Sequence, residues 1–193
     1  MKEKHQIFNK EINYIKNNRI KNSLITMLDK LPDYFYEVPA SSTGKYHPNY
    51  ALGDKGLVRH TKAAVRIAYE LFQDSSLNNF TSDEKDLIIM ALTLHDGLKS
   101  GLKKSEYSLF DHPIIMANYL LDNKSELELT DEEINYVSDA IKTHMGPWTT
   151  NYKGEEVLES PKSKSQRFVH MCDYLASRKF LEVPFDNNND VIN

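Results

Sequence analysis

The sequence of 193 residues predicts an all-α protein folded as one compact helical bundle. Apolar residues recur every three or four positions through most of the chain, which is the period of one helix face. Two Thr-x-x-Glu motifs precede apolar stretches and are typical of helix N-termini, because each side chain satisfies a backbone N–H of the first turn. Strand signals are scarce, and the stretch 155–158 is the best candidate. This length fits one ordinary domain, so we expect residues 1–193 to form a single unit.

The first half of the chain is expected to hold three helices. Residues 5–30 carry apolar side chains at helical spacing, after which two prolines interrupt the pattern. Residues 40–57 are rich in Ser, Gly and Pro and are expected to form a loop. A helix should follow over residues 58–73. Thr81 with Glu84 then opens a buried helix that ends in a His–Asp pair.

The second half of the chain is expected to hold three more helices. Residues 112–123 begin with a histidine and a proline, and proline is well tolerated in the first helical turn. Thr130 with Glu133 predicts the start of the next helix. The last helix is expected over residues 164–183, and the tail, residues 184–193, is expected to fray.

Composition narrows the class of protein. The formal net charge is -4, so the chain lacks the basic balance of a dedicated nucleic-acid-binding protein, although a local basic patch is compatible with it. Cys172 is the single cysteine, which excludes an intramolecular disulfide and a cysteine-based zinc site. No stretch approaches the ~20 apolar residues of a membrane span. The charged N-terminal segment also lacks the apolar region of a signal peptide, so we expect a cytoplasmic protein with no membrane contact.

Six histidines and aspartates are candidate metal ligands. Five lie where an expected helix begins or ends, and the sixth lies in the apolar face of the last helix. Taken singly, such a histidine is usually a cap or a surface group, and such an aspartate can be a hydrogen-bonded core residue. Taken together, they are ligand types that divalent transition metals prefer, and helices that converge at one end of a bundle can assemble them. The six are His60, His95, Asp96, His112, His144 and Asp173.

Three segments carry four of these residues, namely "VRHTKAAVRIA", "LHDGLKSG" and "CDYLASR". Their order resembles the H…HD…D pattern of the HD-domain superfamily of metal-dependent phosphohydrolases. The resemblance covers about residues 44–180 and implies a helical HD domain, with residues 1–40 as an N-terminal helical extension. The ligands that it implies for a first metal ion are His60, His95, Asp96 and Asp173.

Two further histidines extend the resemblance. His112 and His144 fall in order between Asp96 and Asp173, as in the H…HD…H…H…D pattern of binuclear HD phosphodiesterases. In that subgroup Asp96 would bridge two ions, and His112 and His144 would hold the second. The alternative is that His112 and His144 only cap helix ends. The resemblance therefore implies one or two divalent ions, with manganese, iron, zinc, nickel and magnesium left open.

The function that the resemblance implies is hydrolysis of a phosphate ester. We expect a phosphodiesterase that acts on a nucleotide or a short oligonucleotide by attack of a metal-bound hydroxide on phosphorus. Asp96 would orient or deprotonate the attacking water. A phosphomonoesterase or triphosphohydrolase of the same superfamily is the first alternative, since the same ligands serve both. A catalytically silent, metal-stabilised binding module is the second.

Several side chains near the motifs are candidates for contact with the substrate. Lys99 follows Asp96 by three residues, and a lysine stands at the same offset in the motif of HD phosphodiesterases, so it is a candidate for both catalysis and phosphate binding. Aromatic faces accept any base, which makes Trp148 and Tyr46 candidates for stacking. His5 and His170 are assigned to surface and packing. The expected substrate contacts are Lys45, His47, Lys99, Trp148 and Arg178.

Overall fold

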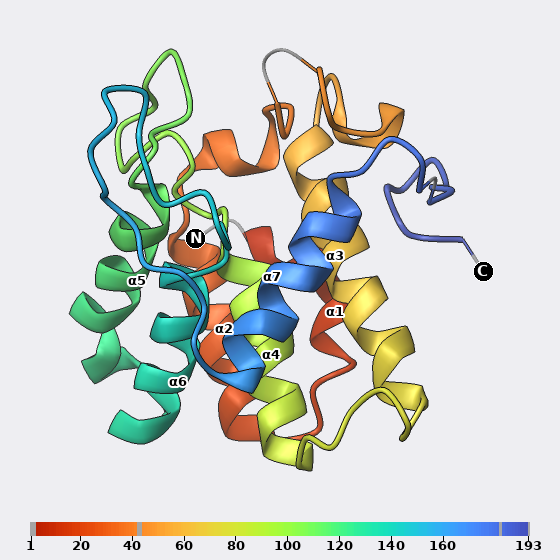
Figure 1. The fold of residues 1–193 in the computed structure, drawn as a ribbon. Helices are drawn as coiled ribbons and strands as arrows, with labels where there is room; N and C mark the ends of the chain where they lie inside the picture. The colour runs from red at the N-terminus through yellow and green to blue at the C-terminus, as the bar shows by residue number, and fades with distance from the viewer. Residues whose placement is uncertain (1–2, 42–43, 182, 193) are drawn as a thin grey trace.

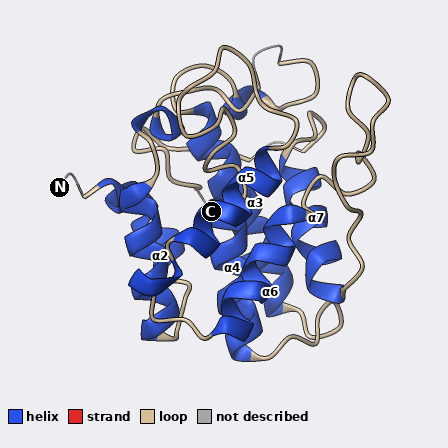
Figure 2. Ribbon diagram, turned by 90° about the vertical axis from the view of Figure 1, so that its left-hand side faces the viewer, coloured by secondary structure: helices blue, strands red, loops and turns tan. Residues whose placement is uncertain are grey.

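The computed structural model of the protein describes residues 3–41, 44–181 and 183–192. Within these ranges the protein consists of helices joined by loops, and β-pairing is confined to two isolated bridges, which confirms the expected all-α class (Figure 2). Outside them lie the chain ends, two residues of the expected 40–57 loop and Glu182 of the expected last helix. No helix in the described ranges is long and apolar enough to cross a membrane. The helices are α1 (Asn9–Ile12), α2 (Asn18–Lys30), α3 (Gly56–Gln73), α4 (Ser82–Leu94), α5 (His112–Asp122), α6 (Asp131–Lys142) and α7 (Lys164–Ala176), with 3-10 helices η1 (Lys4–Phe8), η2 (Asp33–Tyr36), η3 (Asn49–Ala51) and η4 (Lys124–Glu126).

Helix α4 forms the centre of the bundle because it is buried on every side. Every residue from Asp86 to Leu94 is buried, and a helix that is apolar all round is stable only inside a protein. Helix α4 packs against α2, α3, α6 and α7, and Figure 1 shows α5 and α6 on one side of it and α3 on the other. Its C-terminal end therefore delivers His95 and Asp96 into the interior.

Capping boxes fix where three of the helices begin. The capping boxes expected at Thr81–Glu84 and Thr130–Glu133 are both present. A third capping box, Ser163–Gln166, opens α7, beyond the two that the sequence analysis identified. An N-terminal cap contributes roughly 0.5–2 kcal/mol to stability, so these boxes stabilise the first turns of α4, α6 and α7.

The expectation of one helix over residues 5–30 is wrong, because the chain breaks between α1 and α2. The carboxylate of Asp86, on α4, accepts hydrogen bonds from the backbone N–H groups of Lys16 and Asn17, at 3.0 and 2.8 Å. The side chain of Asn17 then caps α2 by accepting from the N–H of Arg19. The break is stabilised by a residue far away in the sequence, which local apolar spacing does not reveal.

Two expectations for the last third of the chain also differ from the structure. Helix α7 ends at Ala176 rather than near residue 183, and the N–H of Ser177 closes its last turn by donating to the Asp173 carbonyl at 3.1 Å. The strand candidate 155–158 forms only the isolated bridge between Glu156 and Thr150. This region is therefore a loop that connects α6 to α7.

The C-terminal tail, which was expected to fray, instead packs on α3. The Nζ atom of Lys62 donates to Asp190 Oδ1 at 2.6 Å, and Arg59 Nη1 donates to Asn189 Oδ1 at 2.7 Å. Lys62 is fully buried. A buried ammonium group needs an anionic partner, and the tail supplies it.

The topology brings the candidate ligands to one end of the bundle. Helices α3 and α5 begin at this end, whereas α4, α6 and α7 finish there. The long loops that precede α3, follow α4 and follow α6 gather above it, at the top of Figure 1. Residues near the start of one helix and the end of the next are therefore neighbours in space.

Candidate metal centre

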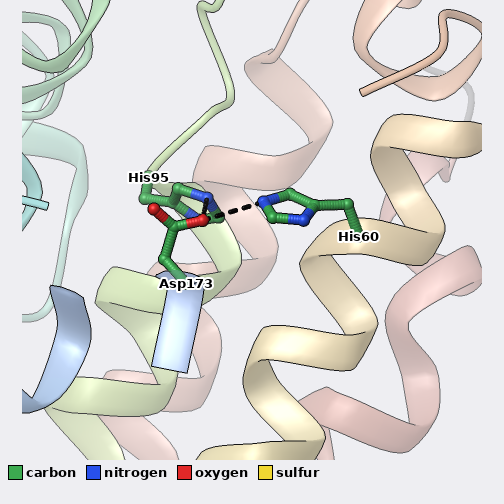
Figure 3. A group of neighbouring side chains, drawn as sticks. All are labelled: His60, His95 and Asp173. Atoms are coloured by element: carbon green, nitrogen blue, oxygen red, sulfur yellow. Dashed lines mark ion pairs between the residues drawn. The ribbon is translucent and has the colours of Figure 1, made fainter. Parts of the chain in front are cut away.

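Three helices bring His60, His95 and Asp173 together (Figure 3). His60 lies in the second turn of α3, His95 is the C-terminal cap of α4, and Asp173 lies in the last turn of α7. The Asp173 Oδ1 atom is 2.9 Å from His60 Nε2 and 3.4 Å from His95 Nε2. Figure 3 shows this carboxylate at the meeting point of the two imidazole rings.

Asp96 links this group to the other two histidines. Its Oδ2 atom lies 3.5 Å from His95 Nε2 and 3.8 Å from His60 Nε2. Its Oδ1 atom lies 3.0 Å from His112 Nε2 and 3.7 Å from His144 Nε2. The two oxygens of one carboxylate therefore approach two different pairs of imidazoles. All six candidate ligands lie in one cluster.

Backbone carbonyls orient three of the four histidines. In each case the ring Nδ1 atom bonds to the carbonyl oxygen three residues earlier, which can only accept, so Nδ1 carries the hydrogen. In the neutral ring this leaves a lone pair on Nε2, the tautomer that binds a metal through Nε2. The bonds run from His95 to Leu92 (2.7 Å), from His112 to Leu109 (2.6 Å) and from His144 to Ile141 (2.8 Å).

Asp173 is partly exposed and the other five cluster residues are buried, and two ionised aspartates dominate the electrostatics of the cluster. Burial opposes the charge on Asp96, but Lys99 and His95 outweigh it and hold the pKa of Asp96 well below its usual range. Burial likewise opposes ionisation of Asp173, but His95 and other imidazole contacts hold its pKa well below its usual range. Burial opposes the charge on His95 as well, yet the two aspartates raise its pKa to about 9. Burial, with the neighbouring His95, lowers the pKa of His144 to about 3.

The donor set fits a divalent cation. Among the described residues, the buried atoms His95 Nε2 and Asp96 Oδ1 have no hydrogen-bond partner, and an unsatisfied buried polar atom costs free energy unless a ligand satisfies it. Mixed imidazole and carboxylate donors suit manganese, iron, nickel and zinc. Two groups of three donors, each within 4.8 Å of one another, are His60 with His95 and Asp173, and His95 with Asp96 and His144.

Lys99 lies beside the cluster, as its offset from Asp96 suggested. Its Nζ atom is 2.6 Å from Asp96 Oδ2, and it lines a cavity of about 750 Å³ into which the cluster faces. A volume in this range is typical of a small-molecule site. The ammonium group therefore places positive charge beside the cluster, in the wall of the cavity.

Most of the expected substrate contacts line this cavity. Lys45 does not line it: its ammonium lies 5.0 Å from the ring centroid of Tyr46, which does. The ring of His47 lies 5.5 Å from that of His60, and burial lowers its pKa to about 3. The expected contacts found in the wall are His47, Lys99, Trp148 and Arg178.

Sequence reasoning missed eight residues of the cavity wall, and three of them lie in α7 or directly after it. His170, which it assigned to packing, bonds through Nδ1 to the His144 carbonyl at 2.7 Å and also lines the cavity. Tyr174 and Ser177 line it as well. Positions three before and four after Asp173 share its helix face, so the spacing of His170 and Ser177 from Asp173 was the signal that could have found them.

Comparison with known protein families gives one finding. The family model for the HD domain matches residues 57–178 of the chain. The match includes every residue of the cluster, from His60 to Asp173. No curated protein and no solved structure matches the chain.

Proposed function

Because the chain belongs to the HD domain family, whose members are generally metal-dependent phosphohydrolases, we propose that it hydrolyses a phosphate ester with one or two divalent ions. The family match covers more than half of the chain and confirms the resemblance inferred from the sequence. The substrate that we propose is a nucleotide or short oligonucleotide, and the bond that is cleaved is a phosphodiester.

One observation carries this proposal: six imidazole and carboxylate donors converge on one buried cluster that faces a cavity. His60, His95 and Asp173 form one set of donors, and Asp96 connects it to His112 and His144. We assign His60, His95, Asp96 and Asp173 to a first ion, and Asp96, His112 and His144 to a second. When bound, a divalent ion makes a water molecule more acidic and polarises a phosphoryl oxygen.

The side chains of the protein then bind and orient the reactants. Asp96 is suited to orient the attacking water, because its carboxylate is ionised and its Oδ1 atom receives no hydrogen bond from the described residues. Lys99 is suited to neutralise charge on the phosphate, since its ammonium lies next to Asp96 and lines the cavity. We propose catalytic roles for these two residues.

Aromatic side chains in the cavity wall support a nucleotide over a simple phosphate ester. Trp148 is 48% exposed and Tyr46 is 57% exposed, and both line the cavity. Large aromatic rings held open to solvent can stack on a base of any kind. The structure offers less support for Lys45 as a phosphate contact, since it lies outside the wall.

The proposal is tested by hydrolysis of bis(p-nitrophenyl) phosphate and p-nitrophenyl phosphate with added manganese, in the wild type and in Asp96→Ala. We expect the diester to be cleaved by the wild type alone. Nucleotides, cyclic nucleotides and short oligonucleotides are then screened with product identification, which names the bond that breaks.

Two outcomes would overturn parts of the proposal. Cleavage of the monoester alone would replace the phosphodiesterase with a phosphomonoesterase of the same family. A protein that binds manganese at the cluster but hydrolyses none of these compounds would be a metal-stabilised binding module, and the proposed enzymatic activity would be wrong.

A further inference from the structure

Arg178 is a positively charged residue in the cavity wall that forms no ion pair with the histidine–aspartate cluster in the described parts of the chain. It follows the end of α7 and lines the cavity. Its guanidinium carbon lies 4.3 Å from the ring centroid of Tyr174 and 6.0 Å from that of Tyr46. Its Nε and Nη2 atoms donate to the Ser177 hydroxyl oxygen at 3.2 and 2.8 Å. Ring contacts and hydrogen bonds together fix the plane of the guanidinium group.

The charge of Arg178 has no anionic partner in the described parts of the chain. No carboxylate there lies within 4.0 Å of its guanidinium nitrogens, whereas Lys99 is paired with Asp96 at 2.6 Å. A guanidinium group carries five N–H donors in a flat fork that matches a phosphate group. The single Ser177 oxygen engages two of these donors, which leaves three for a ligand.

A purely structural role explains less of this arrangement. A cation after the last turn of a helix interacts favourably with the helix dipole, and Arg178 occupies that position. The dipole alone, however, requires neither the stacking on Tyr174 nor the bonds to a neutral hydroxyl. A lysine would serve the dipole equally well, whereas a flat, two-pronged anion contact requires arginine.

We propose that Arg178 binds a second, non-reacting phosphate group of the substrate, while the reacting phosphate lies at the histidine–aspartate cluster. This inference rests on the proposed function and adds a substrate class to it, a nucleotide or dinucleotide that carries two separate phosphates. Asp173 lies in the last turn of α7, Arg178 lies beyond the end of that helix, and both line the cavity. Within the described residues no ion pair joins Arg178 to the cluster, which suits a phosphate separate from the one at the cluster.

The wall next to Arg178 is suited to the rest of such a substrate. Trp148 stacks on Tyr174 with ring centroids 5.8 Å apart and an interplanar angle of 16°. Tyr174 therefore contacts Trp148 as well as Arg178, so an aromatic surface adjoins the anion contact. The base of a nucleotide can stack on this surface while the terminal phosphate of the same molecule contacts Arg178.

The test uses a matched pair of dinucleotides, ApA and 5′-phosphorylated pApA, which differ only in the terminal phosphate. Trp148 is the only tryptophan of the chain and lines the cavity, so its fluorescence reports binding without any need for turnover. The full-length protein is titrated at fixed ionic strength, once with manganese and phosphorothioate-linked dinucleotides and once in EDTA with the natural ones. The variants are Arg178→Gln, Arg178→Lys and Lys179→Gln.

We expect the wild type to bind pApA at least about tenfold more tightly than ApA, the gain typical of a charge-assisted hydrogen-bonded pair. Arg178→Gln should remove this preference and leave the affinity for ApA unchanged within about twofold, and Arg178→Lys should restore part of it. Lys179→Gln makes the same change of charge at an exposed neighbour outside the cavity wall, and it should keep the preference.

Three results would overturn the inference: equal affinity of the wild type for both dinucleotides, no measurable binding of either, or an equal loss in Lys179→Gln. The titration separates this inference from the proposed function. If the protein prefers pApA through Arg178 but hydrolyses nothing, the phosphate subsite is supported and the proposed enzymatic activity is wrong. If the protein hydrolyses phosphodiesters but lacks this preference, the enzymatic activity is supported and the phosphate subsite at Arg178 is wrong.

Discussion

The Nε2 atoms of His112 and His144 lie 3.2 Å apart. The Nδ1 atom of each ring donates to a backbone carbonyl, so in the neutral rings each Nε2 carries a lone pair. Burial keeps His144 neutral by lowering its pKa to about 3. Two lone pairs at this distance repel each other unless a proton or a cation lies nearby, and this favours a second ion over a pair of helix caps.

Replacing both histidines with alanine should therefore change metal content. We expect the wild type to bind two equivalents of manganese or a similar ion and His112→Ala/His144→Ala to bind one, held by His60, His95, Asp96 and Asp173. Turnover should fall more than about 100-fold, since even partners outside the ligand shell typically contribute 10–100-fold. Metal analysis of the purified proteins and steady-state kinetics measure both effects.

The control for this experiment is His5→Ala. His5 pairs with Asp29 at 2.9 Å and does not line the cavity, so its loss should leave the metal content unchanged. If wild type and double variant both bind one equivalent and turn over equally, the second ion does not exist. The assignment of the first ion would be unaffected.

Asp96 is the residue on which both proposed ions depend. We expect Asp96→Ala to lower turnover more than about 100-fold and to reduce the number of bound ions, while circular dichroism shows an intact fold. Asp96→Asn should also lose activity, because an amide keeps the size of the side chain but lacks the negative charge. Full activity of a metal-loaded, folded Asp96→Asn protein would show that Asp96 has no catalytic role.

The ligand cluster was accessible from the sequence because its members combine two features. Each is a histidine or aspartate, and five of the six lie near the ends of helices that local spacing and capping motifs reveal. Their convergence depends on the arrangement of the helices, in which α3 and α5 begin at the end of the bundle where α4, α6 and α7 finish, and local spacing does not show that arrangement. The wall of the cavity was harder to predict. Lys45 and Arg178 are both cations near the motifs and were both expected to contact phosphate, but only Arg178 lines the cavity.

The parts of the fold that sequence reasoning missed depend on contacts between distant segments. Asp86 accepts from Lys16 and Asn17 and so fixes a helix break. The tail is ordered because Asp190 pairs with the buried Lys62. The spacing of residues along the sequence predicts neither contact. A charged residue in an apolar helix, such as Asp86 or Lys62, shows that a partner is needed but does not show which distant residue supplies it.

Gly146 provides a test of how the cavity wall is built. It adopts φ +66, and a Cβ atom at this position would lie 2.2 Å from the His170 ring. We expect Gly146→Ala to destabilise the protein by more than about 1–2 kcal/mol, the cost of the left-handed backbone alone. It should also shift the emission of Trp148, whose ring contacts His170 at a centroid distance of 5.9 Å.

The matched control is Gly154→Ala. Gly154 adopts φ +81, but beyond its chain neighbours no atom of the described residues lies within 4 Å of the position that a Cβ would occupy. Its substitution should therefore cost only the backbone strain and leave the Trp148 emission unchanged. Urea denaturation of both variants measures the difference. Equal destabilisation would mean that the wall tolerates a shift of His170 at no cost.

The buried carboxyl of Glu11 predicts a pH dependence of stability. Burial raises the pKa of Glu11, and Lys62, whose Nζ lies 3.9 Å away, opposes this only in part. The folded protein therefore holds the proton of Glu11 more tightly than the unfolded chain does. The pKa of Glu11 in the unfolded chain is near 4.5, and its pKa in the folded protein is higher. As the pH rises through this interval, ionisation of Glu11 lowers the free energy of unfolding. Above the folded pKa this decrease in stability stays constant.

Glu11→Gln removes this titration while keeping the shape of the side chain. The free energy of unfolding of Glu11→Gln minus that of the wild type should be smallest near pH 4 and should become more positive up to pH 7. Urea denaturation at each pH, in EDTA, measures this difference. Glu132→Gln is the control, because it makes the same change of charge at a residue that is exposed on α6. A difference for Glu11→Gln that is flat or falls with pH would show that Lys62 fully compensates the burial of this charge.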